Sequence, residues 1–306
     1  MENKEKNFIS AVVYVRNCED MIAGFLLRLK DALEAHFEHF EIICVNDASS
    51  DNSAGAVREI AGQIGQTSVT ILHLSSFHGR EAAMQGGVGL SIGDFVYEFD
   101  FPYEDITEDD LMSLYDKSME GNDIVAAVTG KKSKFTSRIF YKIFNSSADI
   151  NYNLDTEYFR LLSRRAINRT GSQNKIIAYR KMAYASCGLK YASVNLNKSP
   201  KIVTTRAGRK ARRDLAVDSI LMFTNVGFTF SLIMTAAMMV IMIAIAVYAL
   251  IAKISGGTIV GWTSTVLLIA FGFFGIFGML TIITKYLQLL ININVKRKTF
   301  TFENIE

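Results

Sequence analysis

The sequence predicts an α/β domain with a doubly wound, mostly parallel sheet, followed by a two-helix membrane hairpin. Strand-like and helix-like segments alternate over residues 8–128, which is typical of parallel strands connected by helices. Between Asp218 and Lys285 the only charged residue is Lys253. Each uncharged stretch beside this lysine is longer than the roughly 20 apolar residues that cross a bilayer as a helix.

The first half of the α/β domain is predicted from short apolar runs and from helical periodicity. Phe8–Val15 is rich in β-branched residues, which indicates a buried parallel strand, and Phe40–Val45 and Val69–Leu74 are similar runs. Apolar residues recur with helical spacing in Cys18–His36. Turn and N-cap residues after the second strand predict a further helix at Ala54–Ile64.

The second half continues the alternation. Ser76–Leu90 is predicted to be a loop that opens into a helix, and a Gly-Asp turn then leads into the strand Phe95–Phe99. A helix is expected at Asp109–Met119 and a strand at Asp123–Val128. Ser137–Asn145 has the pattern of a basic amphipathic helix.

The charge pattern divides the chain into a soluble domain, an interfacial helix and the hairpin. Residues 207–221 carry arginines followed by apolar side chains, which suits a helix lying at a membrane surface. The predicted segments are the soluble domain 1–205, the amphipathic helix 206–218, the spans 219–252 and 261–284, the outer turn 253–260 and the basic tail 285–306.

Basic clusters flank the hairpin at its outer ends. Seven Lys/Arg and no acid lie between Lys198 and Arg213, and Lys296-Arg297-Lys298 follow the second span. The positive-inside bias therefore places the soluble domain and both termini in the cytoplasm, with the chain a multi-pass protein of the plasma membrane. The amino terminus, MENKEKNFIS, is polar and shows no secretory signal.

Other compositional features are less informative. The net charge of +3 does not argue for a nucleic-acid partner. The three cysteines have neither metal-like nor disulfide-like spacing. Four glycines in the hairpin would permit close helix contact, either within the hairpin or between copies in a homo-oligomer: Gly227, Gly272, Gly275 and Gly278.

Polar clusters follow the predicted strands. In open parallel sheets, ligands bind beyond the carboxyl ends of the strands. We therefore expect four segments to surround one crevice: Tyr14–Glu19, Asn46–Asp51, His78–Glu81 and Glu98–Glu104.

Two of these clusters suggest a nucleotide site with a metal ion. Asn46-Asp47, followed by small residues and Asp51, offers acceptors to a base and a ribose, although an ordinary N-cap with a polar turn is the alternative. Glu98 and Asp100 lie two residues apart and would point the same way from a strand end. Paired carboxylates suit a hard divalent cation that bridges a diphosphate, and a solvated acidic loop is the alternative.

Taken in order, these motifs resemble those of the family 2 glycosyltransferases of the polyprenyl-phosphate type. VRNCED, VNDASSD, HGREAA and EFD are similar to the family's nucleotide and metal segments. DTEYFRL is similar to its acceptor segment, and TRAGRK to the basic loop before its first membrane helix. The resemblance runs nearly end to end and implies a GT-A fold, a nucleotide-sugar donor and a polyprenyl-phosphate acceptor.

The residues and the resemblance together assign roles along the chain. Predicted nucleotide contacts are Tyr14, Asn17, Glu19, Asp47, Gly79 and Arg80. The resemblance implies a Mg²⁺ or Mn²⁺ ion held by Glu98 and Asp100, and predicted catalytic residues are Asp100, Asp155 and Arg160. The acceptor phosphate is expected to meet Arg138, Arg160 and Arg206, and a structural ion pair is the alternative for Arg160.

The sequence departs from the family pattern at several of these motifs. Glu98 stands where relatives carry aspartate, and Tyr158 stands where they carry an acid. Asn46 and Ala48 depart from the usual nucleotide loop. These departures predict either a different donor sugar or reduced activity.

The leading hypothesis is transfer of a sugar from a UDP-linked donor to undecaprenyl phosphate, with inversion, for a cell-surface glycan. A phosphate acceptor is already anionic at neutral pH and needs positioning more than a base. The first alternative is transfer to a hydroxyl of a lipid-linked glycan, with Asp155 or Asp100 as the base. The second is a weakly catalytic membrane scaffold that binds a nucleotide sugar or partner glycosyltransferases.

Overall fold

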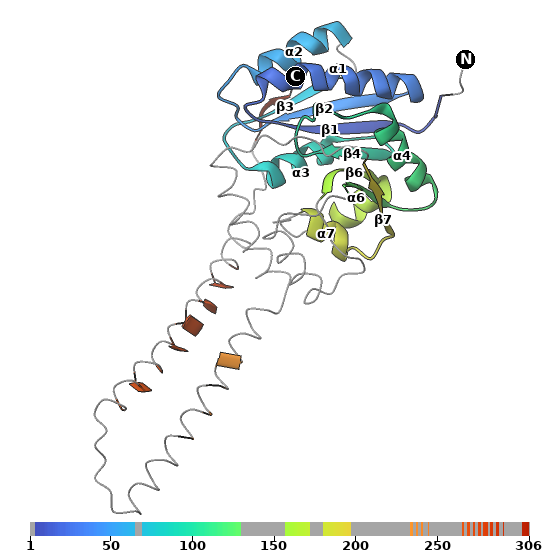
Figure 1. The fold of residues 1–306 in the computed structure, drawn as a ribbon. Helices are drawn as coiled ribbons and strands as arrows, with labels where there is room; N and C mark the ends of the chain where they lie inside the picture. Colours follow the sequence, from blue (N-terminus) through green and yellow to red (C-terminus); the bar gives the residue numbers. More distant parts are fainter. Residues whose placement is uncertain are drawn as a thin grey trace, which may run out of the picture. The chain divides into compact units, whose positions relative to one another are not determined.

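The structure is a computed structural model that describes residues 4–64, 69–129, 157–171, 180–196 and 302–305, with single helical residues between 233 and 290. The chain forms two units. Unit 1 consists of Met1–Leu215 and Lys296–Glu306, and unit 2 consists of Ala216–Val295. Unit 1 carries the sheet and its helices (Figure 1). Unit 2 is therefore an insertion into unit 1 along the chain.

Unit 1 is built on an eight-stranded sheet of order β7-β5-β6-β4-β1-β2-β3-β8. β1 pairs in parallel with β2 and β4, β2 with β3, and β5 with β7. β6 runs antiparallel between β4 and β5, and β8 runs antiparallel to β3. The strands are β1 Ile9–Val15, β2 Phe40–Asn46, β3 Val69–Leu74, β4 Phe95–Phe99, β5 Ile124–Val128, β6 Glu157–Ser163, β7 Tyr191–Asn195 and β8 Phe302–Ile305. The parallel centre is confirmed, but the sheet as a whole is mixed because of β6 and β8, which were not predicted.

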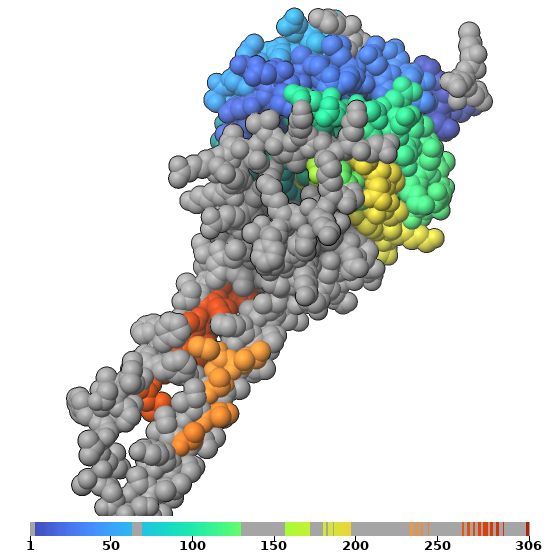
Figure 2. Space-filling model, viewed as in Figure 1, coloured from blue at the N-terminus to red at the C-terminus, as the bar shows by residue number. Residues whose placement is uncertain are grey.

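Helices cover both faces of this sheet, as the doubly wound class requires. Ile9, Ala11 and Val13 of β1 belong to a core cluster with buried residues of α1, α2 and α4, whereas Val12 and Tyr14 pack with α3. This alternation follows from the two-residue period of a strand. The described helices are α1 Glu19–His36, α2 Ser53–Ile64, α3 Arg80–Leu90, α4 Glu108–Met119, α6 Arg164–Gly171 and α7 Arg180–Ser186. In the space-filling view, the blue residues of the amino-terminal part and the green residues of α4 share one surface (Figure 2).

Helix α3 approaches the sheet closely at Gly87. A Cβ added there would lie 2.5 Å from Val45 Cγ2 and 2.6 Å from Val12 Cγ1. Such distances are shorter than van der Waals contact, so any side chain at this position would push α3 away from β1 and β2. This close packing fixes the helix whose first residue is Arg80.

Replacing Gly87 by alanine is expected to lower the free energy of unfolding by about 1–3 kcal/mol, because the added methyl overpacks the interface. Gly89→Ala is the matched control. Nothing lies within 4 Å of a Cβ at Gly89, and alanine is the better helix former by up to about 1 kcal/mol. Thermal unfolding of the purified chain should therefore shift in opposite directions for the two variants. A shift of the same sign in both would contradict the close approach of α3.

The carboxyl-terminal residues form the edge strand β8. Ile305 pairs with Leu72, Asn304 with His73 and Phe302 with Leu74. The segment 285–306, predicted as a basic tail, therefore also contributes a strand to unit 1. It follows that the chain leaves unit 1 before unit 2 and returns to it afterwards.

The described residues of unit 2 are helical and carry apolar side chains at the surface. Several are seen as orange and red atoms in Figure 2. The exposed positions recur every three or four residues: Ile233, Ala237, Val240 and Ala244, and later Ile276, Leu280, Ile283, Leu287 and Leu290. Within the part of the chain that the structure describes, no helix combines the length and the apolar character needed to cross a membrane. Most residues of the predicted spans 219–252 and 261–284, and the predicted helices 137–145 and 206–218, lie outside the described residues.

Candidate active site

The carboxyl ends of the central strands meet at one edge of the sheet. Val15 of β1 is the register partner of Asn46 of β2, and Val13 is the partner of Phe99 of β4. The segments that follow these strands therefore leave from one edge, where the sequence predicts a crevice. They form two clusters of polar side chains, a loop cluster after β1–β3 and a charged cluster after β4.

Asp47 holds the loop cluster together. Its carboxylate is fully buried and accepts hydrogen bonds from Tyr14 Oη at 2.9 Å, from the backbone N–H of His78 at 2.8 Å and from that of Gly79 at 3.0 Å. Burial and the neighbouring Asp47 raise the pKa of Tyr14, so this hydroxyl remains a donor. Asp47 thus fixes the loop that leads to Arg80, and this geometry favours a positioning role over a direct nucleotide contact.

Gly79 is needed for this arrangement. Its φ of 85° lies in the left-handed region, which a residue with a side chain seldom adopts. Its backbone N–H can then donate to Asp47, and Arg80 follows as the first residue of α3.

Asn17 and Glu19 join the loop after β1 to the loop after β2. Asn17 Oδ1 accepts from the backbone N–H of Ser50 at 2.8 Å, and Glu19 Oε2 accepts from that of Asn52 at 2.7 Å. Both side chains are exposed, so their remaining polar atoms face solvent at the predicted nucleotide edge. The loop cluster thus contains every predicted nucleotide residue except Arg80, which belongs to the charged cluster.

Glu98 lies at the base of the charged cluster. It faces Arg160 across the β4–β6 pair and is 1% exposed. Its Oε1 accepts a hydrogen bond from Tyr184 Oη at 2.6 Å, and its Oε2 accepts one from Arg160 Nη1 at 3.1 Å. Oε2 also lies 3.0 Å from Arg180 Nη1. Both oxygens of Glu98 are therefore engaged by donors.

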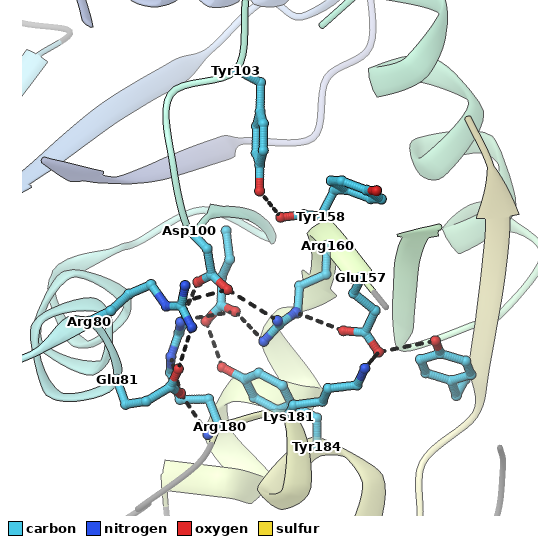
Figure 3. Close-up of polar contacts among 12 residues, drawn as sticks. Arg80, Glu81, Asp100, Tyr103, Glu157, Tyr158, Arg160, Arg180, Lys181 and Tyr184 are labelled. Carbon is cyan, nitrogen blue, oxygen red and sulfur yellow. Dashed lines mark hydrogen bonds and ion pairs between the residues drawn. The ribbon is translucent and has the colours of Figure 1, made fainter. Parts of the chain in front are cut away.

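Asp100 lies one step further out, beyond the end of β4, with its side chain 15% exposed. Its Oδ1 accepts from Arg180 Nη2 at 2.5 Å, whereas Oδ2 is 3.7 Å from Arg160 Nη2 and 3.8 Å from Arg80 Nε. Figure 3 shows these three arginines around Asp100. Burial alone would raise the pKa of Asp100, but the guanidinium groups of Arg80, Arg180 and Arg160 outweigh it and hold this pKa well below its usual range.

Two further carboxylates complete the charged cluster. Glu81 Oε2 accepts from the backbone N–H of Arg180 at 3.0 Å and from Arg180 Nε at 3.3 Å. Glu157 lies 3.3 Å from Arg160 Nε and 3.2 Å from Lys181 Nζ. Among the described residues, the cluster balances four acids against four bases: Glu81, Glu98, Asp100 and Glu157 with Arg80, Arg160, Arg180 and Lys181.

A divalent cation would find one suitable carboxylate in this cluster. Within the described residues, no three Asp, Glu, His or Cys side chains are placed to hold a metal ion together. Glu98 has no oxygen left for a cation, because Tyr184 and two arginines occupy both. The geometry therefore favours a positioning role for Glu98 over its predicted role as a metal ligand. Asp100, which is more exposed, fits that role better.

Several residues of the charged cluster were not predicted. Arg180, Lys181 and Tyr184 come from α7 and Glu157 from β6, and Glu81 has no role of its own among the sequence predictions. One signal was available: Arg180-Lys181 interrupts an otherwise largely apolar run, IIAYRKMAYA. Adjacent charges in such a run indicate buried ion pairs. Three predicted residues, Arg138, Asp155 and Arg206, lie outside the described residues.

These features agree with the resemblance found in the sequence. The family model for glycosyl transferase family 2 matches residues 10–188, and the chain belongs to this family. The matched range includes the loop cluster and all of the charged cluster. The GT-A class predicted for the soluble domain is accordingly confirmed as a mixed α/β sheet.

Curated relatives share part of their length with this chain. An uncharacterized glycosyltransferase of Synechocystis is 28% identical over 199 residues, which are 63% of this chain and 62% of that protein. The undecaprenyl-phosphate 4-deoxy-4-formamido-L-arabinose transferase of Aeromonas hydrophila is 26% identical over 148 residues, 48% of this chain and 45% of that protein. A prophage bactoprenol glucosyl transferase homolog of Escherichia coli is 28% identical over 162 residues, 51% and 52% of the two chains. The chain thus spans between 45% and 62% of the length of these relatives.

A solved structure also aligns with the chain. The mannosyltransferase from Pyrobaculum calidifontis in complex with GDP-Man and Mn²⁺ is 15% identical, with a TM-score of 0.47 over 71% of this chain and 63% of that chain.

Proposed function

We propose that this chain transfers a sugar from a UDP-linked nucleotide sugar to undecaprenyl phosphate or another polyprenyl phosphate, with inversion at the anomeric carbon. The product would serve the assembly or modification of a cell-surface glycan. The observation that supports this proposal best is the convergence of three guanidinium groups on Asp100, those of Arg160 and Arg180 buried and that of Arg80 partly exposed, beside the loops predicted to bind the nucleotide. Guanidinium groups bind phosphate oxygens through paired, charge-assisted hydrogen bonds. The names of the Aeromonas hydrophila and Escherichia coli relatives support a lipid-phosphate acceptor.

The depressed pKa of Asp100 favours a phosphate acceptor over a hydroxyl acceptor. A hydroxyl must lose its proton during transfer, and an effective base has a pKa near the working pH. The arginines around Asp100 make it a poor base. A phosphate monoester needs no such base, because its second pKa is near 6. Arg160 would position that phosphate, with Arg138 and Arg206 as further proposed contacts, and Asp155 remains the candidate base for a hydroxyl acceptor.

We propose in addition that a divalent cation binds at Asp100 together with the donor. Asp100 is the carboxylate that would hold Mg²⁺ or Mn²⁺ together with the donor's diphosphate. When bound, such an ion would offset the charge that develops on the departing nucleotide diphosphate. Glu98 would act beneath it by holding Arg160 and Arg180 in place.

We further propose that unit 2 anchors the chain in the plasma membrane as the hairpin 219–284. Its exposed apolar positions recur with helical spacing, which suits lipid contact. The chain re-enters unit 1 through β8, so a membrane-crossing unit 2 must cross an even number of times. The basic clusters before and after unit 2 then place unit 1 and both termini in the cytoplasm.

The test is a transfer assay in membranes that contain the chain, undecaprenyl phosphate and a panel of radiolabelled UDP- and GDP-sugars. We expect label to move into the organic phase from one UDP-sugar, and Asp100→Ala to lower this rate by at least about 100-fold, since the residue lies at the centre of the site. Arg165→Gln, whose side chain is 71% exposed, is the control and should leave transfer unchanged.

Three results would contradict the proposal. No transfer from any donor would remove the proposed activity and leave a nucleotide-binding scaffold. Transfer only when a preassembled glycan lipid is supplied would show a hydroxyl acceptor. Equal transfer by Asp100→Ala and the unaltered chain would show that the charged cluster is not the reaction site.

A further inference from the structure

We infer that Asp100 occupies, in the ligand-free chain, the place of a phosphate group of the donor's diphosphate, and that Arg180 is the main residue that takes up this phosphate. This inference rests on the proposed function, because it identifies the anion as the diphosphate of a nucleotide sugar. It assigns a diphosphate-binding role to Arg180 and a positioning role to Glu98.

Arg180 is unusual in being almost wholly buried while contacting three acids. Its side chain is 1% exposed and lies 3.3 Å from Glu81, 3.0 Å from Glu98 and 2.5 Å from Asp100. A buried arginine needs good hydrogen bonds to offset the loss of water. Yet Arg180 Nη1 makes no hydrogen bond, although an acid lies within ion-pair distance. The same is true of Arg160 Nε, on a residue that is 5% exposed.

The three acids around Arg180 are not equally fixed. Glu98 belongs to β4 and is held by the strand ladder on both sides, with Val12 and Arg160 as its register partners. Asp100 lies past the end of β4, and two of its three arginine contacts are 3.7 Å and 3.8 Å long. Ion pairs of this length are beyond hydrogen-bond distance. Of its three arginines, Arg180 alone is therefore within hydrogen-bond distance of Asp100.

A diphosphate would fill this position more completely than the carboxylate does. Each phosphate of a nucleotide sugar's diphosphate has the same number of non-bridging oxygens and the same charge as the Asp100 carboxylate, so the linked pair offers the guanidinium groups twice as many oxygens and twice the charge. Three guanidinium groups from α3, β6 and α7 surround the position (Figure 3). Arg180 Nη2, which now donates to Asp100, would donate to a phosphate oxygen instead.

When no cation is present, the charge balance of the cluster favours an exchange of Asp100 for the diphosphate. The described cluster is neutral with Asp100 among its arginines, so a diphosphate cannot add to it without either a cation or the withdrawal of an acid. When the diphosphate binds, Arg180 would pass from Asp100 to the phosphate, and Asp100 would be released toward solvent or toward a cation. Glu98 would hold Arg160 and Arg180 in place during this change.

This exchange predicts opposite effects for two substitutions when no divalent metal is present. Binding of inorganic pyrophosphate is measured by calorimetry with the purified full chain in EDTA. Asp100→Asn removes the competing charge and should tighten binding by at least about tenfold. Arg180→Gln removes the main donor and should weaken binding by at least about tenfold. Arg165→Gln is the matched control and should change neither value.

Alternative explanations give different results. If Asp100 acts only as a metal ligand, Asn at this position will not tighten pyrophosphate binding in EDTA. If Arg180 is only structural, Arg180→Lys, which keeps the charge and loses the planar fork, will bind as the unaltered chain does. Arg180→Lys also serves if Arg180→Gln does not fold. Either of these results would overturn the inference. Pyrophosphate binding is measured apart from sugar transfer, so the two failures can be distinguished: absence of transfer with both binding shifts as expected would reject the proposed function and leave a diphosphate site without an assigned donor.

Discussion

Arg160→Met is expected to lower the free energy of unfolding by about 3–5 kcal/mol, because it leaves buried acids without their partner. Glu98 is 1% exposed and would lose one of its two arginines. Among the described residues, Glu157 would keep Lys181 and Tyr191 as partners. Methionine fills much of the same volume, so the loss reflects charge rather than a cavity. Chemical denaturation of the purified chain measures it.

The same substitution separates the two roles predicted for Arg160. If Arg160 positions the acceptor phosphate, the folded variant should lose transfer by at least about 100-fold, with a raised KM for undecaprenyl phosphate. Arg160→Lys keeps the positive charge but loses the planar guanidinium group. Compared with Arg160→Met, it should recover more of the stability than of the transfer rate. Arg165→Met should shift stability by no more than about 0.5 kcal/mol, as expected of an exposed residue. If Arg160→Met is destabilised but transfers sugar at the normal rate per folded molecule, Arg160 has only the structural ion-pair role.

The part of the fold that the sequence predicts well is the part with simple patterns. β1 to β4 are apolar runs between turn signals, and each is found within one residue or two of its expected bounds. β6 escaped prediction because charged Glu157 and Arg160 interrupt its apolar pattern. Their charges are balanced by residues on other elements, which a local pattern does not reveal. β8 is only four residues long, and its pairing with β3 joins segments more than 200 residues apart in the chain.

In the candidate site too, contacts between residues on different elements do not follow from the local sequence pattern. The sheet edge and the residue types gathered there follow from strand order, so the sequence predicts which segments meet at this edge. Strand order does not predict which residue each of these side chains contacts. The nucleotide contact of Asp47 stays a prediction, whereas its contacts in the structure, with Tyr14 and with the backbone of the loop after β3, could not be predicted. That outcome depends on the left-handed backbone of Gly79, which residue type alone does not specify.

Glu98→Asp is the second substitution with a large expected effect, and it distinguishes a positioning role from metal binding. The family pattern carries aspartate here. If Glu98 bound the metal, Glu98→Asp should therefore leave the transfer rate unchanged or raise it. In this structure the longer side chain reaches Tyr184, Arg160 and Arg180 together. Shortening it by one methylene would withdraw the carboxylate from these donors and displace both arginines. Because a displacement of about 1 Å can cost on the order of 100-fold, we expect transfer to fall by 10- to 100-fold.

The metal dependence of transfer decides between the two roles. Rates for Glu98→Asp are measured over a series of Mg²⁺ and Mn²⁺ concentrations, with the exposed Glu104→Asp as the matched control. If Glu98 is a positioning residue, Glu98→Asp lowers the maximal transfer rate, while the metal concentration at half-maximal rate stays the same. Glu98→Gln then transfers at the same rate as Glu98→Asp or more slowly. For a metal ligand, Glu98→Asp keeps its rate and only Glu98→Gln needs more metal. Since Tyr184 and the two arginines engage both oxygens of Glu98, the first pattern is the one that the charged cluster requires.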